Sequence, residues 1–449
     1  MSTSMQDRFA RIGALKPARR NTALPEDETP RGHLPDIPAG AERLAQILGA
    51  TTRENCFGAH LGLRRWFSEV IDGDTKVAAP ETEFDLAALR LIAPGAHDCV
   101  ADPRQWLFLD TETTGLAGGT GMYPFLVGIA WWDAGGLEVE QFFMREQSEE
   151  HSLLTALAER LAERSVLVTF NGKSFDWPLL ETRYRMTRTI EPPVPRAHLD
   201  FLHPARALWR LRLGSVRLPE LEKHVLGWNR GADVMSELIP QIYFDYLRGA
   251  SPEPLVPIFH HNQMDLRGLA ALATRVLSLV GNPETQGQDG FELFGVSRIC
   301  ERRGDLRARK LYERSIACEL PPEADRVARR SLARLAKREG DHALACSLWE
   351  GMLGNSREGF EAYEQLAIYY ERHAREPHLA AALARKALAE LRKADRLGTI
   401  APHAYRTGRA RFEKRLARLE RKAGRTLLDT LEAESRTPAG ESNPQTARR

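Results

Sequence analysis

The sequence predicts a mixed α/β sheet covered by helices, followed by an all-α C-terminal region. Three consecutive segments rich in β-branched and aromatic residues lie between residues 106 and 144. Helical patterns then alternate with short apolar runs. Beyond about residue 282 the strand patterns stop, and similar helical segments recur about 34 residues apart.

The N-terminal part precedes this sheet. Residues 1–40 are expected to form a disordered tail, because five prolines interrupt every helical pattern there. Residues 41–103 contain short amphipathic pieces with no recognisable fold of their own. We expect them to pack as an extension on the domain formed by residues 104–282.

The first three strands of that domain are expected to be antiparallel. The first, at 106–112, is an apolar run that ends in two carboxylates. The second and third lie at 123–132 and 137–144, and the sequence Asp-Ala-Gly-Gly between them is a turn signal. Helix and strand then alternate, with helices at 152–164, 174–186 and 254–280 and strands at 166–170 and 197–202.

The C-terminal region carries an internal repeat. Residues 332–353 match 366–388 and also 296–316, each as a helix, a polar turn and a second helix. A period near 34 residues is typical of tetratricopeptide-like helical repeats, here within 290–400. An irregular helical bundle is the alternative. Such repeats bind protein partners, so a protein partner is possible here.

The last segment, 401–449, is expected to be a basic helix followed by a polar tail. Residues 401–425 contain nine Lys or Arg and two Glu. In one interpretation these charges balance the acidic repeats. In the other, the helix is a surface that follows the phosphates of a nucleic acid, with salt-dependent affinity.

Composition excludes several classes of protein. Lys plus Arg is 63 and Asp plus Glu is 61, so the net charge of +2 does not fit a polybasic protein. No run of 18 apolar residues occurs, so we expect no membrane span. The N-terminus lacks the apolar core of a secretory signal. None of the five cysteines forms a CxxC pair, so a cytoplasmic protein without disulfides is expected.

Four carboxylates are the candidate catalytic groups. Asp110 and Glu112 are two residues apart on a strand, so both side chains face the same side. Two such carboxylates repel each other unless a cation lies between them, and divalent ions prefer oxygen ligands. Asp176, at the start of a helix, and Asp265, within a helix, are each unremarkable alone.

Together these motifs resemble the DEDD family of 3′→5′ exonucleases, the DnaQ-like branch of the ribonuclease H-like superfamily. FLDTETTGL, FNGKSFDWPLL and HHNQMD occur in the family's order within 104–282. The third motif departs from the family's usual His-x4-Asp or Tyr-x3-Asp, because histidines occupy both registers. The chain is most similar to the YprB-like group, which the segments LPELEKHVLGW and DVMSELIPQIYFDYL also resemble.

The resemblance implies a reaction and a set of catalytic residues. Asp110, Glu112, Asp176 and Asp265 would hold two Mg²⁺ or Mn²⁺ ions for in-line hydrolysis of a phosphodiester bond. The substrate would be the 3′ end of DNA or RNA, and the products would be 5′-mononucleotides. An inactive nucleic-acid-binding or scaffold protein is the alternative function.

Two histidines compete for the role of general base. His260 fits the His-x4-Asp spacing. His261 lies four residues before Asp265, so it shares that helix face. Both remain candidates, with a slight preference for His261. His198 and His203 are expected to be structural or surface residues.

The same resemblance names candidate substrate-binding residues: Thr113, Thr114, Gly115, Leu116 and Asn171. A plain glycine turn is the alternative for the first four, and a loop-capping role is the alternative for Asn171. Asp200 follows a strand and is expected to cap the next helix.

Overall fold

A seven-stranded mixed sheet forms the centre of the computed structural model, which describes residues 40–68, 82–96, 100–115, 121–287, 289–354 and 359–435. The strand order is β1-β2-β5-β4-β3-β6-β7. The first five strands in this order are antiparallel neighbours, and β6 and β7 run parallel to β3. Their bounds are β1 Thr51–Asn55, β2 Gly58–Phe67, β3 Trp106–Thr113, β4 Pro124–Asp133, β5 Gly136–Phe143, β6 Val166–Thr169 and β7 Ala197–Asp200.

The structure confirms the strands expected at β3 to β7 and adds two. The β4–β5 turn lies where expected, with Ala134 and Gly135 in the left-handed region at φ 48° and 81°. Strands β1 and β2 were not predicted. They form a hairpin that extends the sheet through pairing of β2 with β5. Residues 51–67 are therefore part of the sheet.

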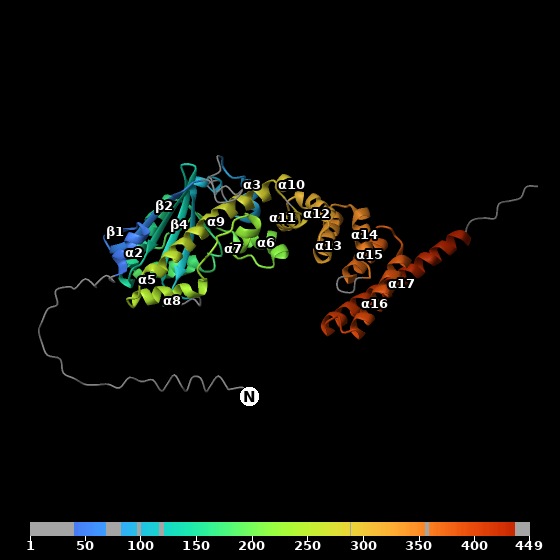
Figure 1. Cartoon of the computed structure of the whole chain (residues 1–449). Coiled ribbons are helices and arrows are strands. Elements are labelled where there is room, and N and C mark those ends of the chain that lie inside the picture. Colours follow the sequence, from blue (N-terminus) through green and yellow to red (C-terminus); the bar gives the residue numbers. More distant parts are fainter. Residues whose placement is uncertain are drawn as a thin grey trace, which may run out of the picture.

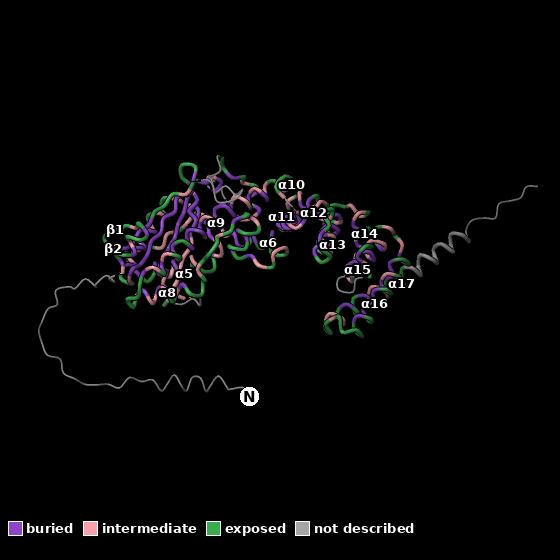
Figure 2. The backbone as a smooth tube through the Cα atoms, in the orientation of Figure 1, coloured by how far each residue is buried: buried purple, intermediate pink, exposed green. Residues whose placement is uncertain are grey.

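The central strands of the sheet are buried along most of their length, as the purple tube in Figure 2 shows, whereas the edge strand β1 is partly exposed. Alternate residues of β3 enter different cores: Trp106 and Phe108 on one face, and Leu107 and Leu109 on the other. This alternation follows from the pleat of a strand, whose successive side chains point to opposite faces.

Helices cover the sheet, and α9, the longest of those in this part of the chain, runs across it in Figure 1. Their bounds are α2 Gly40–Leu48, α3 Leu86–Ile92, α4 Glu150–Glu163, α5 Asp176–Thr187, α6 Leu202–Leu213, α7 Leu218–Val225, α8 Ile239–Leu247, α9 Val256–Gly281 and α10 Pro283–Gln286. Short 3₁₀ helices lie at Pro103–Gln105, Gln147–Glu149, Ser236–Leu238 and Glu253–Leu255. With 26 residues, α9 is about 39 Å long.

The C-terminal region is helical and extends away from the sheet (Figure 1). Its helices are α11 Gly290–Arg303, α12 Arg307–Ala317, α13 Pro322–Arg338, α14 His342–Gly351, α15 Gly359–Arg372, α16 Pro377–Arg396 and α17 Pro402–Ser435. Helix α11 is anchored to α6. The indole N–H of Trp209 donates to Glu292 at 2.9 Å, and a Cβ at Gly295 would lie 2.7 Å from the backbone of Leu208.

Three arginines of α17 form ion pairs with glutamates of α15. Arg411 lies 2.8 Å from Glu364, and Arg418 lies 2.6 Å from Glu371. Arg415 contacts both glutamates. These ion pairs agree with the charge-balancing interpretation. Arg425 lies outside the described side chains, and binding of phosphates by the remaining basic residues stays a prediction.

Two further expectations concern the whole chain. In the described part, no helix is long and apolar enough to cross a membrane. The described cysteines Cys56, Cys300, Cys318 and Cys346 are free. Cys99 and the expected tails at 1–39 and 436–449 lie outside the described residues.

Candidate active site

The two acids of β3 both contact α9. Asp110 Oδ2 accepts a hydrogen bond of 2.8 Å from the amide of Asn262. Glu112 Oε1 lies 3.8 Å from Nε2 of His261. The spacing of two residues on a strand thus places both carboxylates against the same helix.

Asn262 is held in place by a row of residues across the sheet. Asp110, Gly128 and Gln141 are cross-strand neighbours on β3, β4 and β5. The amide of Gln141 donates to Asn262 Oδ1 at 2.7 Å. A Cβ at Gly128 would lie 2.0 Å from that same oxygen, so only glycine leaves room for the Asn262 side chain.

Asn262 and Gln141 were not predicted as site residues. Asn262 lies within the quoted HHNQMD motif, but its role depends on contacts with two strands. A glycine inside a buried strand indicates close approach of another group. Gly128 was therefore the available signal.

Asp176 is the first residue of α5 and joins the same cluster. Its Oδ1 accepts a hydrogen bond of 2.5 Å from the hydroxyl of Thr111 on β3. The preceding loop is held by Asp200, which accepts the N–H of Asn171 at 2.8 Å. Asp200 also accepts the N–H of Leu202, the first residue of α6, at 3.0 Å, although Phe201 and not Asp200 occupies the N-cap position of that helix.

His261 lies between the carboxylates, whereas His260 is exposed. Nε2 of His261 is 3.6 Å from Asp265 and 3.8 Å from Glu112. Its Nδ1 lies 2.8 Å from Asp233, an acceptor, so Nδ1 carries the proton of this hydrogen bond. Among the described residues, no ion pair or hydrogen bond joins His260 to any of the four acids.

A buried arginine, Arg230, is the unexpected member of the site. Its guanidinium lies 2.5 Å from Asp265 and 3.4 Å from Asp233, and it forms a two-point ion pair with Glu222. A Cβ at Gly268 would lie 1.7 Å from Glu222, so this glycine makes room for the pair. No sequence motif indicated Arg230, and its partner in the acidic cluster, Asp265, lies 35 residues further along the chain.

Burial and like charges govern the electrostatics of the site. Burial raises the pKa of Asp110 well above its ordinary range, and the charges of Asp265 and Asp176 raise it further. Burial and the charge of Asp110 do the same to the pKa of Glu112. Burial, with the charge of Asp200, raises the pKa of Asp176 to about 6. A cation bound among these groups would relieve the repulsion.

The donors suit a hard divalent ion by their chemistry, since Mg²⁺ and Mn²⁺ prefer carboxylate oxygens. The carboxylate groups lie further apart in this structure than the ligands of a bound metal ion do. Within the described ranges, no three His, Cys, Asp or Glu side chains are close enough to hold an ion. The carboxylate of Asp265 is instead paired with Arg230.

The expected substrate-binding residues lie in two places. Thr113 and Thr114 stabilise the end of β3: Thr113 donates to the carbonyl of Gly115 at 2.8 Å, and Thr114 accepts the N–H of Tyr123 at 3.0 Å. Leu116 lies outside the described residues. Asn171, at φ 70°, lines the cleft beside the acids.

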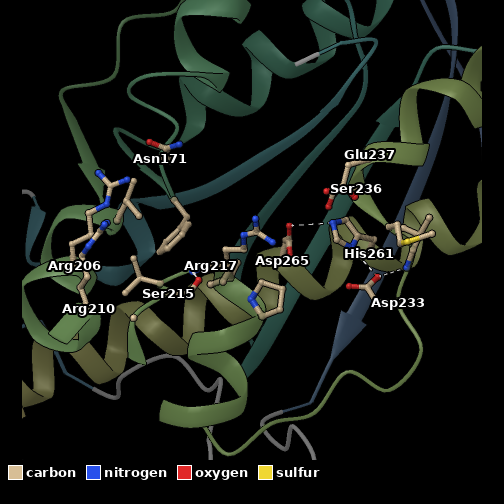
Figure 3. A pocket seen from close by; sticks show the side chains of 18 residues that line it. Asn171, Arg206, Arg210, Ser215, Arg217, Asp233, Ser236, Glu237, His261 and Asp265 are labelled. Carbon is tan, nitrogen blue, oxygen red and sulfur yellow. Dashed lines mark hydrogen bonds and ion pairs between the residues drawn. The ribbon is translucent and has the colours of Figure 1, made fainter. Parts of the chain in front are cut away.

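This cleft has a volume of about 760 Å³ (Figure 3). His261, Asp265 and Asp233 line it, together with Asn171 and residues of the segments 202–219 and 233–237. Its volume falls within the range of roughly 300–1,000 Å³ typical of ligand sites.

A mixed sheet with acids gathered from β3, α5 and α9 beside such a cleft defines a protein of the ribonuclease H-like class. A family model described as RNase_H superfamily matches residues 107–277. The chain is also 32% identical over 288 residues to a Bacillus subtilis (strain 168) protein named "Uncharacterized protein YprB", covering 63% of this chain and 69% of YprB. The chain therefore belongs to the family of YprB and contains an RNase_H superfamily domain at residues 107–277.

One solved structure to which part of the chain is similar is the family B DNA polymerase from the hyperthermophilic archaeon Pyrobaculum calidifontis. It is 17% identical with a TM-score of 0.32, over 44% of this chain and 29% of the polymerase. The chain thus spans less than a third of that protein. Superfamily membership itself indicates nuclease activity, and nucleases of this fold typically use divalent metal ions.

Proposed function

We propose that this protein is a metal-dependent 3′→5′ exonuclease of the DnaQ-like, DEDD type that releases 5′-mononucleotides from nucleic acid. The observation that carries the proposal is the gathering of Asp110, Glu112, Asp176 and Asp265, from three elements, beside a cleft that Asp265 lines. Burying four acids together destabilises a fold unless they hold cations. A role in metal-dependent catalysis would explain why the chain has such a cluster.

In this proposal the four carboxylates would hold two Mg²⁺ or Mn²⁺ ions. When bound, such ions supply Lewis acidity and lower the pKa of water. His261 accepts the proton of the attacking water at Nε2, which faces the carboxylates. Asp233 acts as a positioning residue, because its hydrogen bond keeps the proton on Nδ1 and leaves Nε2 free to accept. Asn262 orients the carboxylate of Asp110.

A second candidate function is a nucleic-acid-binding protein without catalysis. The ion pair between Arg230 and Asp265 favours it, because a guanidinium lies where one ligand of an ion would be needed. In the exonuclease proposal, Asp265 exchanges this partner for the metal. The two candidates therefore differ in a measurable property, which is metal-dependent hydrolysis.

The deciding experiment incubates the full chain with 5′-labelled single-stranded DNA and RNA in Mg²⁺, Mn²⁺ or EDTA. We expect stepwise shortening from the 3′ end in metal and none in EDTA. A 3′-phosphate should block the reaction. Asp110→Asn should lower the rate at least about a hundredfold, while Asp102→Asn, outside the cleft, serves as the matched control. Binding without hydrolysis would favour the second candidate, and cutting of a closed circle would indicate an endonuclease.

We also propose that α11 to α16 form three tetratricopeptide-like helix pairs that bind a protein partner. The repeat predicts equivalent positions, and these are buried in all three copies: Val296, Leu332 and Leu366, followed by Ser297, Ala333 and Ala367. Small residues at the second position allow close helix packing. Ala333→Leu and Ala367→Leu should each lower the melting temperature of the full chain, whereas the same change at exposed Ala343 should not.

A further inference from the structure

Three arginines line one end of the cleft whose other end holds His261. Arg206 and Arg210 lie one turn apart on α6, and Arg217 immediately precedes α7. In Figure 3, Arg206 and Arg210 lie at one end, His261 lies at the other, and Arg217 lies between them. A single cleft therefore joins a cationic wall to the acidic site.

These three arginines are exposed, and no hydrogen bond or ion pair involves their side chains within the described ranges. Other arginines nearby are paired: Arg212 on the same helix lies 2.6 Å from Asp289. Like charges four residues apart weaken a helix by a few tenths of a kcal/mol. The placement of Arg206 and Arg210 therefore serves neither pairing nor helix stability, and their donors are available to a ligand.

The helix that carries two of them is a rigid support. The opposite side of α6 is buried through Leu208 and Trp209. Trp209 is hydrogen-bonded to Glu292 of α11, and α11 approaches α6 closely at Gly295. The guanidinium groups are thus attached to a backbone whose position relative to the acids is fixed by packing.

The chemistry of the wall matches a chain of phosphates. Arginine presents a planar set of donors that binds phosphate oxygens at two points. The same cleft contains Met235, whose 63% exposure leaves apolar surface for bases. Three cations spread along a cleft fit successive phosphates better than they fit one small anion. A volume of about 760 Å³ encloses a few unpaired nucleotides rather than a duplex.

We propose that Arg206, Arg210 and Arg217 bind the backbone phosphates of a single-stranded polynucleotide whose terminal nucleotide lies at the carboxylates. This inference rests on the proposed function and identifies the surface that holds its substrate. The alternative surface on α17 is less suited, because Arg411, Arg415 and Arg418 are already paired with glutamates.

The test measures binding rather than hydrolysis. Fluorescein-labelled oligothymidylate and oligouridylate of about twelve nucleotides are titrated with the full chain in EDTA over a series of salt concentrations. We expect the triple variant Arg206→Gln, Arg210→Gln, Arg217→Gln to bind at least about tenfold more weakly at low salt. Each phosphate contact on a single strand contributes about 0.7 to the slope of log K against log salt. Losing three contacts should therefore reduce the slope by about 2.

A matched control removes the same charge elsewhere. Arg196, Arg302 and Arg338 are exposed and lie outside the lining of this cleft. Their triple Gln variant should keep the parent affinity and slope. A variant with Lys at positions 206, 210 and 217 keeps the three positive charges, so it should retain most of the slope of log K against log salt. Thermal melts verify that every variant is folded, as expected for exposed side chains.

The outcomes separate this inference from the proposed function. Parent-like binding by the cleft variant, or an equal loss in the control, overturns the inference. The inference is also overturned if the parent protein binds a blunt duplex as tightly as it binds the single strand. It is overturned too if the cleft variant loses affinity for a free mononucleotide but not for the oligonucleotides. If arginine-dependent binding is found while the chain hydrolyses nothing in metal, the inference stands and the exonuclease proposal fails.

Discussion

Replacing Asp176 by Asn should stabilise the metal-free fold while it removes activity. The pKa of Asp176 is raised from 3.8 to about 6, chiefly by burial. A carboxyl with a raised folded-state pKa favours folding below pH 3.8, and that stability is lost as the pH rises through about 6. The difference of about 2.2 units corresponds to about 3 kcal/mol at about 1.36 kcal/mol per unit. This is an upper bound, since the residue is partly exposed.

The assay is thermal unfolding of the full chain in EDTA at about pH 8 and about pH 4. At the higher pH we expect Asp176→Asn to melt about 6–12 °C above the parent, from about 2–4 °C per kcal/mol for a domain of this size. At the lower pH the difference should shrink, because the parent carboxyl becomes protonated. The Asn side chain can still accept the hydrogen bond from Thr111. Activity in Mg²⁺ should fall at least about a hundredfold.

Asp102→Asn is the control with the opposite sign. The side chain of Arg104 lowers the pKa of Asp102, so its loss should slightly destabilise the protein at neutral pH and leave activity intact. An Asp176→Asn protein no more stable than the parent at high pH would refute the electrostatic reasoning. An active Asp176→Asn protein would refute the assignment of the site.

Three further outcomes are expected. His261→Ala should slow release of 3′ nucleotides about a hundredfold or more, whereas the matched His260→Ala variant should stay within a few-fold of the parent; equal effects would remove the distinction. Burial and neighbouring arginines lower the pKa of His60 to about 4, so its contribution to stability is present above pH 6.5 and lost as the pH falls towards 4. His60→Gln should reduce the loss of urea resistance over that interval, and an unchanged acid profile would contradict this. Arg415→Gln with Arg418→Gln should destabilise the helical region by about 2 kcal/mol, since buried Glu371 loses two arginine partners and keeps the weaker contact with Lys422 at 4.0 Å; an unchanged melt would show that these ion pairs contribute nothing.

The strands that carry the acids could be predicted because their signal is local. Segments 106–112, 123–132 and 137–144 have the residue types of buried strands, and all three are strands in the structure. The hairpin of β1 and β2 could not be predicted in this way. Its first strand, TTREN, is polar and lies at the edge of the sheet, so it has no apolar alternation to detect. Pairing of β2 with β5 decides its conformation.

The acidic residues could also be predicted from sequence motifs, whereas the basic residues of the neighbouring cleft could not. Asp110, Glu112, Asp176 and Asp265 occur in motifs with recognisable order and spacing. The wall formed by Arg206, Arg210 and Arg217 has no such motif and becomes visible only as the lining of a cleft. An arginine exposed on a helix has the same local pattern whether it faces bulk water or a binding site.

The strands β3 to β7 and the long helix α9 were predictable from local patterns, and the four acids were recognisable as candidates from their motifs. Hydrophobic periodicity and motif spacing depend on neighbouring residues, so the chain displays them before it folds. By contrast, the contact of Asn262 with Asp110 over Gly128 and the pairing of Arg230 with Asp265 depend on the folded arrangement of the helices and strands. Those contacts join residues 152 and 35 positions apart, and they form only when α9 packs across the sheet and the segment after α7 returns to it.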